Sequence, residues 1–221
     1  MNVAGCLGRL GYKVLLVDAD PQVSAMEWRM NHEENLLSFE IRAHPFPTIH
    51  KDLPRWPEAE THDIIIIDCP PGGQGKYGQN DNVTRSAILA SNIVLIPVRP
   101  SPLDYQASIR LMPLLDEIHQ LRPELKAFLV INSKPPGKTR ISAAAKDTAR
   151  RFFSVEGFAV GILETELFTR TAYVEVPITG KTVVDYDPTS KASLEIQNLT
   201  QEILLCLNPT TGEISATSGA R

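Results

Sequence analysis

The sequence has few cysteines and no long apolar run, and each of these absences excludes a class of protein. Its three cysteines are far apart in the chain, and no Cys-x-x-Cys pair or Cys/His cluster with metal-ligand spacing accompanies them. This pattern argues against a disulfide-rich secreted domain and favours a reducing compartment such as the cytoplasm. The apolar stretches, such as residues 64 to 67, are far too short to cross a bilayer, so we expect neither export nor membrane insertion.

Positive charge is not in excess either. The chain carries a formal net charge of −4 at pH 7, which argues against a protein that coats nucleic acid through its overall field. Hydrophobic residues make up 43% and charged residues 22% of its 221 residues, as in ordinary globular proteins. We expect one domain over residues 1–208, followed by a polar tail over residues 209–221.

Short apolar runs alternate with helical patterns along the chain. The chain starts in a helical pattern that ends at Gly11. Strands are predicted at residues 13–17, 62–68, 93–97, 127–132 and 159–163, with an edge strand and a helical turn in the proline-rich region 38–61. Helices are predicted at residues 103–121, with a kink at Pro113, and at residues 141–155 and 190–207. This alternation predicts an α/β fold with a mostly parallel sheet and helices on both of its faces.

Polar side chains stand at the carboxyl ends of the predicted strands, where parallel sheets bind their ligands. Asp18 and Asp20 follow one strand, and Asp68 follows the run HDIIII. The four successive isoleucines of this run are typical of a central strand buried on both faces. Neighbouring carboxylates repel each other unless a cation or hydrogen-bond donors lie between them. A magnesium nucleotide would supply that cation, and aspartates that merely terminate strands are the alternative.

Four blocks of the sequence resemble successive blocks of the ParA-type partition ATPases, and together they span nearly the whole chain. They are KVLLVDADPQVSAMEW, HDIIIIDCPPG, SNIVLIPVRPSPLDYQA and GKTVVDYDPTSKASLEIQNLTQEIL. The third block is most similar to the small plasmid-partition branch, which has no N-terminal DNA-binding domain. The resemblance implies a three-layer P-loop NTPase-like fold, a homodimer formed around ATP and Mg²⁺, non-specific binding to nucleoid DNA, and a ParB-like centromere-binding adaptor as partner.

The resemblance also implies a role for each strand-end residue. Asp20 matches the switch aspartate that orients the attacking water, Asp18 matches the aspartate that supports the phosphate loop and the magnesium shell, and Asp68 matches the Walker B position. Asn132 resembles the asparagine that recognises the base, and Pro100 is the second nucleotide-binding candidate. These roles suit phosphoryl transfer, in which positioning and charge neutralisation supply most of the catalysis.

One family element is missing from the printed sequence. The KGG-x-GKT/S loop and the strand before it should precede the helix in which Met1 already stands. Because that strand is central in the family, its absence should leave backbone N–H and C=O groups of the neighbouring strands without hydrogen-bond partners. We therefore expect a functional protein to need residues upstream of Met1. The alternatives are a non-catalytic remnant that has lost ATP binding, or a related ATPase with a different cargo.

Two stretches imitate the missing loop. Residues 132–139, NSKPPGKT, and residues 175–182, EVPITGKT, both end in Gly-Lys-Thr but lack the first glycine of the pattern. The prolines of the first remove N–H donors, and Glu175 of the second would repel a polyphosphate, so we interpret both as decoys.

The most basic stretch lies between residues 134 and 151. Its end, Arg150 and Arg151, is the candidate DNA contact, and a solvated helix face is the alternative. The five histidines show no metal-ligand spacing, so we expect structural roles for them.

Overall fold

The computed structural model describes residues 1–22, 25, 27–28, 37–71, 79–137, 143–153 and 157–207. Within them, every strand pairing is parallel. The first sheet has the order β2-β1-β3, with β1 (Val14–Asp18) between β2 (Glu40–Ala43) and β3 (Ile64–Asp68). The second has the order β4-β5-β6, formed by β4 (Ile93–Val98), β5 (Lys126–Lys134) and β6 (Val160–Phe168).

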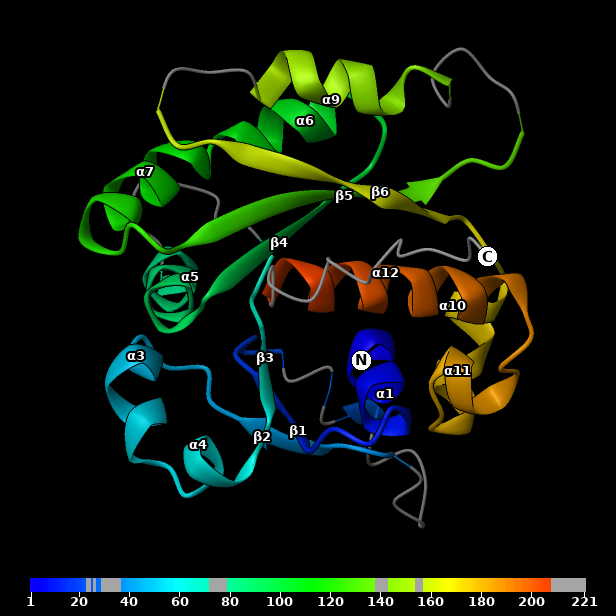
Figure 1. Ribbon diagram of the computed structural model, residues 1–221, viewed down its shortest axis with the longest axis horizontal. Coiled ribbons are helices and arrows are strands. Elements are labelled where there is room, and N and C mark those ends of the chain that lie inside the picture. The colour runs from blue at the N-terminus through cyan, green and yellow to red at the C-terminus, as the bar shows by residue number, and fades with distance from the viewer. Residues whose placement is uncertain are drawn as a thin grey trace, which may run out of the picture.

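Helices cover the two sheets and lie between them (Figure 1). They are α1 (Asn2–Arg9), α3 (Ile49–Asp52), α4 (Glu58–Thr61), α5 (Gln79–Ala90), α6 (Pro102–Ile109), α7 (Met112–Leu121), α9 (Ala145–Phe153), α10 (Ala172–Glu175), α11 (Val183–Tyr186) and α12 (Lys191–Leu207), with 3₁₀ turns η1 (Leu53–Arg55) and η2 (Val176–Thr179). None of these helices is both long enough and apolar enough to cross a bilayer. The fold is therefore the expected α/β arrangement of parallel strands flanked by helices.

The parallel strands form two sheets instead of the single sheet that we expected. Strand β3 is an edge of the first sheet and β4 is an edge of the second, and no described strand pairs with both of them. All five residues of β1 are buried, whereas Ile64–Ile67 of β3 are only partly buried. The prediction that β3 is buried on both faces is therefore wrong for the described chain, because one of its edges has no neighbouring strand there.

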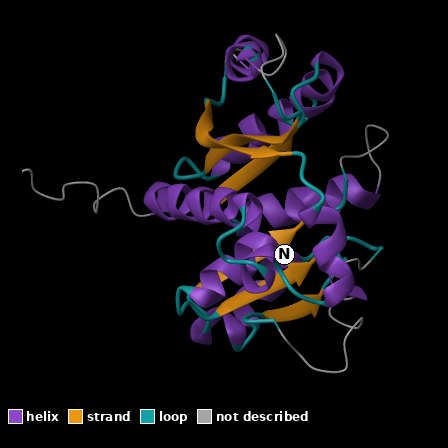
Figure 2. Cartoon of the chain, turned by 90° about the vertical axis from the view of Figure 1, so that its right-hand side faces the viewer, coloured by secondary structure: helices purple, strands orange, loops and turns teal. Residues whose placement is uncertain are grey.

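Helix α12 connects the two sheets, and both views place it between them (Figures 1 and 2). Leu199 and Ile203 of α12 pack with Val130 and Leu163 of the second sheet. Leu204 packs against the cluster formed by α1 and the first sheet, which includes Leu16. The apolar faces of α12 thus join two cores that no strand pairing joins in the described chain.

Two predicted elements differ from the structure in their bounds. The predicted helix over residues 103–121 is two helices, and the break at residues 110–111 comes before Pro113. Pro113 lies in the first turn of α7, where its missing N–H costs nothing. The strand predicted at residues 159–163 continues to Phe168, because Glu164 and Glu166 sit in the strand as partners of lysines.

Candidate functional site

The ends of β1 and β3 bring two of the predicted aspartates together. Asp18 and Asp68 are direct partners in the parallel pairing of these strands, each at its carboxyl end. The backbone continues this pairing, since the N–H of Ala19 donates to the carbonyl of Asp68 at 2.9 Å. The carboxyl edge of the first sheet therefore carries two adjacent carboxylates, as the strand-end pattern predicted.

Asp18 organises the backbone that follows β1. Its side chain is buried, with 1% of the residue exposed. Its two carboxylate oxygens accept hydrogen bonds from the N–H groups of Asp20, at 3.2 Å, and of Ala25, at 3.0 Å. A buried carboxylate needs such donors, so Asp18 holds in place the loop that carries Asp20.

Asp20 is partly buried and begins the same loop. One of its carboxylate oxygens accepts a hydrogen bond from the N–H of Gln22 at 2.9 Å. Among the described residues, no hydrogen bond reaches its second oxygen, and a group that orients water requires such acceptor capacity.

Asp68 reaches solvent at the end of β3, but protein surrounds its carboxylate at longer range. This desolvation raises the pKa of Asp68, the nearby ammonium group of Met1 partly offsets the rise, and the charges of Asp18 and Asp20 add to it. A cation placed beside these three carboxylates would oppose the rise in the pKa of Asp68.

The donors at this edge are hard oxygen atoms, which suit Mg²⁺. The described residues nevertheless contain no group of three His, Cys, Asp or Glu side chains close enough to form a protein cage for a metal ion. Mg²⁺ usually keeps several waters and binds one or two carboxylates together with substrate phosphates. Asp68, which reaches solvent at this edge, is the carboxylate that could hold an ion of that kind through water.

The two predicted nucleotide-binding residues lie at the same end of the second sheet. Val98 of β4 pairs with Ile131 of β5, and this is the last pair between the two strands. Pro100 comes shortly after Val98 and Asn132 directly after Ile131, so both lie at this end of the sheet. Pro100 is buried, and Asn132 is partly buried within β5. The prediction that Asn132 stands at a strand end is therefore slightly wrong, because β5 continues to Lys134.

The backbone beside Asn132 has an unusual conformation that no sequence pattern indicated. Ser133 has φ of 51°, in the left-handed region that favours glycine, and its N–H donates to the side-chain oxygen of Asn132 at 2.9 Å. The hydroxyl of Thr169 donates to the carbonyl of Ser133 at 3.1 Å. Thr169 thereby supports a strained turn next to a candidate site, a contact between distant residues that sequence spacing could not predict.

The structure bears on both imitations of the phosphate loop. In the second, Thr182 is fully buried, and its hydroxyl donates to Asp185 at 2.5 Å, so this hydroxyl is already engaged by a carboxylate. Its methyl and hydroxyl groups also press against Gly5 of α1, where a Cβ would lie 2.6 Å from them. Lys138 and Thr139 of the first imitation lie outside the described residues.

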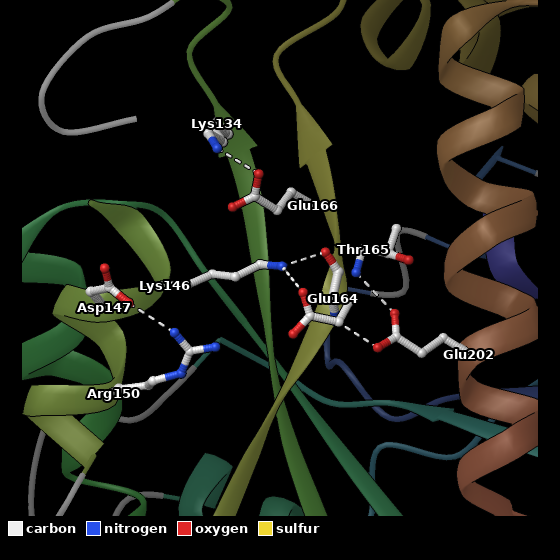
Figure 3. Close-up of polar contacts among 8 residues, drawn as sticks. All are labelled: Lys134, Lys146, Asp147, Arg150, Glu164, Thr165, Glu166 and Glu202. Carbon is white, nitrogen blue, oxygen red and sulfur yellow. Dashed lines mark hydrogen bonds and ion pairs between the residues drawn. The ribbon is translucent and has the colours of Figure 1, made fainter. Parts of the chain in front are cut away.

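Carboxylates neutralise much of the basic stretch (Figure 3). Lys134 pairs with Glu166 at 2.5 Å, Lys146 with Glu164 at 2.7 Å, and Arg150 with Asp147 at 2.8 Å. Arg151 is exposed on α9, and Lys138 and Arg140 lie outside the described residues. These pairs favour a solvated helix face for Arg150, and Arg151 is the better candidate for a phosphate contact.

Comparisons with known proteins show which proteins the chain is similar to. No model of a known protein family matches the chain. It is 26% identical over 207 residues to the maintenance of carboxysome distribution protein A of Halothiobacillus neapolitanus, covering 92% of this chain and 88% of that protein. It is 25% identical over 232 residues to the chromosome-partitioning ATPase Soj of Thermus thermophilus, with the same coverage of 92% and 88%.

Solved structures share the fold at lower sequence identity. The apo McdA structure superimposes with a TM-score of 0.67 at 16% identity, covering 91% of this chain and 93% of that chain. The MinD cell division protein of Aquifex aeolicus also superimposes with a TM-score of 0.67 at 16% identity, covering 92% and 88%. The chain is therefore similar over most of its length to proteins of carboxysome distribution and chromosome partition, and it shares the fold of the solved McdA and MinD structures.

Proposed function

We propose that this protein is a ParA-like ATPase that positions a large cellular cargo through an ATP-dependent switch. The observation that carries the proposal is the pairing of Asp18 with Asp68 at the carboxyl edge of the first sheet, with Asp20 on the loop that Asp18 holds. Two further facts support it: one relative is named a chromosome-partitioning ATPase and another is named for carboxysome distribution, and both match most of the chain.

In this proposal the three aspartates act in phosphoryl transfer. Asp20 orients the attacking water with its carboxylate, and Asp18 fixes the position of Asp20 through the loop backbone. Asp68 and Asp18 hold the hydration shell of Mg²⁺, which would neutralise charge on the phosphates when bound. Asn132 and Pro100 contact the base at the edge of the second sheet.

Nucleotide binding also needs a phosphate loop. We propose that a strand pairs with both β3 and β4 and leads into a Gly-Lys-Thr or Gly-Lys-Ser loop beside Asp18 and Asp68. Two observations support this proposal: the isoleucines of β3 are only partly buried, and no described strand pairs with one edge of β3 or one edge of β4, whereas buried parallel strands normally pair on both sides.

The cargo is a plasmid, a chromosome or a protein compartment. Among the relatives, Soj and ParA are named for chromosome partition and one is named for carboxysome distribution, so the relatives support a positioning role more strongly than any one cargo. We propose that the protein acts as a homodimer in the cytoplasm, binds nucleoid DNA non-specifically in its ATP state, and is stimulated by a ParB-like adaptor.

A non-catalytic interaction protein is the second candidate. It is favoured by one observation: neither Gly-Lys-Thr stretch of the printed sequence has the full phosphate-loop pattern. Titration with Mg-ATP separates the candidates, since only the ATPase binds it.

The aspartate roles are tested by replacing Asp20 with alanine in a protein that carries a phosphate loop. ATP hydrolysis should fall to background while the Kd for Mg-ATP stays within about threefold, because Asp20 acts on water and not on the nucleotide. Unchanged hydrolysis would remove the catalytic role of Asp20. Glu60→Gln, a change at an exposed carboxylate on α4, is the control.

A further inference from the structure

Strand β5 contains a bulge at Asn132, the predicted base-binding residue. The register of β5 against β6 shifts between Ile131 and Lys134. Asn132 and Ser133 of β5 consequently lie opposite one residue of β6, Leu167. A bulge disrupts the pairing locally and redirects a side chain, and bulges are common next to functional sites. The bulge therefore gives Asn132 an orientation that a regular strand would not give it.

The backbone of this bulge is in a strained conformation. With φ of 51°, Ser133 is the one residue other than glycine that has a positive φ in the part of the chain that the structure describes. Such a conformation persists only where surrounding contacts hold it, and it occurs most often at functional sites. The contacts that hold Ser133 are therefore informative about function.

Thr169, which directly follows β6, holds the bulge from the neighbouring strand. Its hydroxyl donates to the carbonyl of Ser133 at 3.1 Å, and its N–H donates to the carbonyl of Lys134 at 2.9 Å. The ammonium group of Lys134 is paired with Glu166 of β6 at 2.5 Å, and only 11% and 17% of these side chains are exposed (Figure 3). Contacts with the end of β6 thus fix the bulge on both its hydroxyl-bonded and its charged side.

The bulge also decides which atoms of Asn132 are available to a ligand. The side-chain oxygen of Asn132 accepts a hydrogen bond from the N–H of Ser133 at 2.9 Å. Among the described residues, no hydrogen bond occupies its NH₂ group. The side chain therefore offers two N–H donors, while its oxygen is engaged by the backbone.

We propose that Thr169 and Ser133 are positioning residues that direct the NH₂ group of Asn132 to the base of the nucleotide, where it donates to N7 of a purine. N7 is an acceptor in both adenine and guanine, whereas the group at C6 is a donor in adenine and an acceptor in guanine. Asn132 held in this way recognises the edge that purine nucleotides share. This inference rests on the proposed function, because it requires a bound nucleotide.

The first measurement compares Mg-ATP with Mg-7-deaza-ATP, in which a C–H group replaces N7. Calorimetric titration of the protein that carries a phosphate loop gives a selectivity ratio, the Kd of Mg-7-deaza-ATP divided by the Kd of Mg-ATP. The ratio should be roughly five, as expected for the loss of one hydrogen bond between uncharged groups. Equal Kd values would overturn the inference alone, whereas the absence of Mg-ATP binding would overturn the proposed function with it.

Thr169→Val tests the positioning role. Valine has the size of threonine but cannot donate to the carbonyl of Ser133, and the exposed position leaves no buried cavity. The selectivity ratio should fall to about one, because the released bulge no longer directs the NH₂ group of Asn132 to N7. Thr169→Ser keeps the hydroxyl and should keep the ratio. If Thr169 were merely structural, the valine variant would weaken both nucleotides alike, and an unchanged ratio would contradict the inference.

Asn132→Asp identifies the atom that contacts the base. Aspartate still accepts the hydrogen bond from Ser133 but has no NH₂ group. The selectivity ratio should again fall to about one, since no donor remains for N7. A ratio that stays at the value of the unchanged protein would show that another group contacts N7 and would overturn the inference. Because aspartate preserves the hydrogen bond within the bulge, this variant decides the question if Thr169→Val does not fold.

The matched control is Thr61→Val on α4. The hydroxyl of Thr61 is also exposed and also donates to a backbone carbonyl, that of Pro57, at 3.1 Å. Helix α4 lies beside the first sheet, away from β5 and β6 (Figure 1). This variant should keep the selectivity ratio of the unchanged protein. Loss of the ratio in the control as well would contradict a specific role for Thr169.

Discussion

At the residue scale, the three aspartates at the carboxyl edge of the first sheet differ in burial and in hydrogen bonding. Asp18 is buried and accepts two backbone hydrogen bonds, Asp20 is partly buried in a turn, and Asp68 reaches solvent among other charges. Burial with donors suits a structural carboxylate, and spare acceptor capacity suits a catalytic one. Local hydrogen bonding thus supports the division of roles proposed for them.

Replacing Asp18 with alanine should destabilise the protein by about 2–3 kcal/mol, because the N–H groups of Asp20 and Ala25 lose a charged acceptor. Urea denaturation followed by circular dichroism measures the change. Asp20→Ala removes only a local turn contact and serves as the comparison. A loss below about 0.5 kcal/mol, the size of an ordinary surface change, would contradict the role of Asp18.

Asp68→Asn should alter how stability depends on pH. Desolvation raises the pKa of Asp68 in the folded state above its ordinary value of 3.8, so the unfolded state releases its proton first. Folding stability from this group is therefore highest at low pH and falls as pH rises from that value through the folded pKa. Asp68→Asn should gain stability relative to the unchanged protein over this interval.

Thermal unfolding of both proteins from about pH 3 to about pH 7 measures this difference. The Tm of Asp68→Asn minus the Tm of the unchanged protein should increase as pH rises and then level off. A gap that is flat or that narrows as pH rises would contradict the shifted pKa.

Cys69 should resist alkylation in the folded protein. Burial, with a contribution from Asp68, raises the pKa of its thiol to about 12. Roughly one thiol in ten thousand is then ionised at pH 8, and only the thiolate reacts. Peptide mapping after iodoacetamide treatment should show labelling of Cys69 in urea but very little without it. Equal labelling in both conditions would contradict this burial.

At the element scale, the sequence predicted strands and helices best where one pattern dominates. The apolar run of β1 and the helical periodicity of α12 gave bounds within one residue of the structure. Helix α5 was not predicted, because its first turns are polar and the sequence before them is rich in proline and glycine. The length of β6 was missed because its glutamates depend on lysines from other elements.

The candidate site could be predicted only in part, because some of its residues follow from local patterns and others depend on contacts between distant residues. Residues at strand ends follow from the chain alone, so the pairing of Asp18 with Asp68 was foreseeable. The support of Ser133 by Thr169 and the neutralisation of the basic stretch are contacts between distant residues. Such contacts have no periodic signature in the sequence.

Helix α9 is the element on which DNA binding is tested. The ion pair between Arg150 and Asp147 occupies one guanidinium, so Arg151→Glu should weaken binding of non-specific duplex DNA more than Arg150→Glu does. The slope of log Kd against log salt should change by about one for Arg151→Glu if it contacts one phosphate. Fluorescence anisotropy with Mg-ATP present measures both quantities. No change in either variant would exclude α9 as a DNA contact.

At the scale of the whole molecule, two parallel sheets share one connecting helix. Helix α12 packs on both cores and binds the edge of β6, so it carries much of the connection between them in the described chain. The facing edges of β3 and β4 have no partner strand there. A strand inserted between them would bury their apolar side chains and join the carboxyl edges into one site.

The central claim is that these joined edges bind and hydrolyse ATP. The most direct measurement is calorimetric titration with Mg-ATP, followed by a hydrolysis assay, on the protein purified from its native cells. We expect one ATP bound per chain and hydrolysis that Asp20→Ala abolishes. Absence of Mg-ATP binding by that protein would contradict the account and favour the non-catalytic interaction protein.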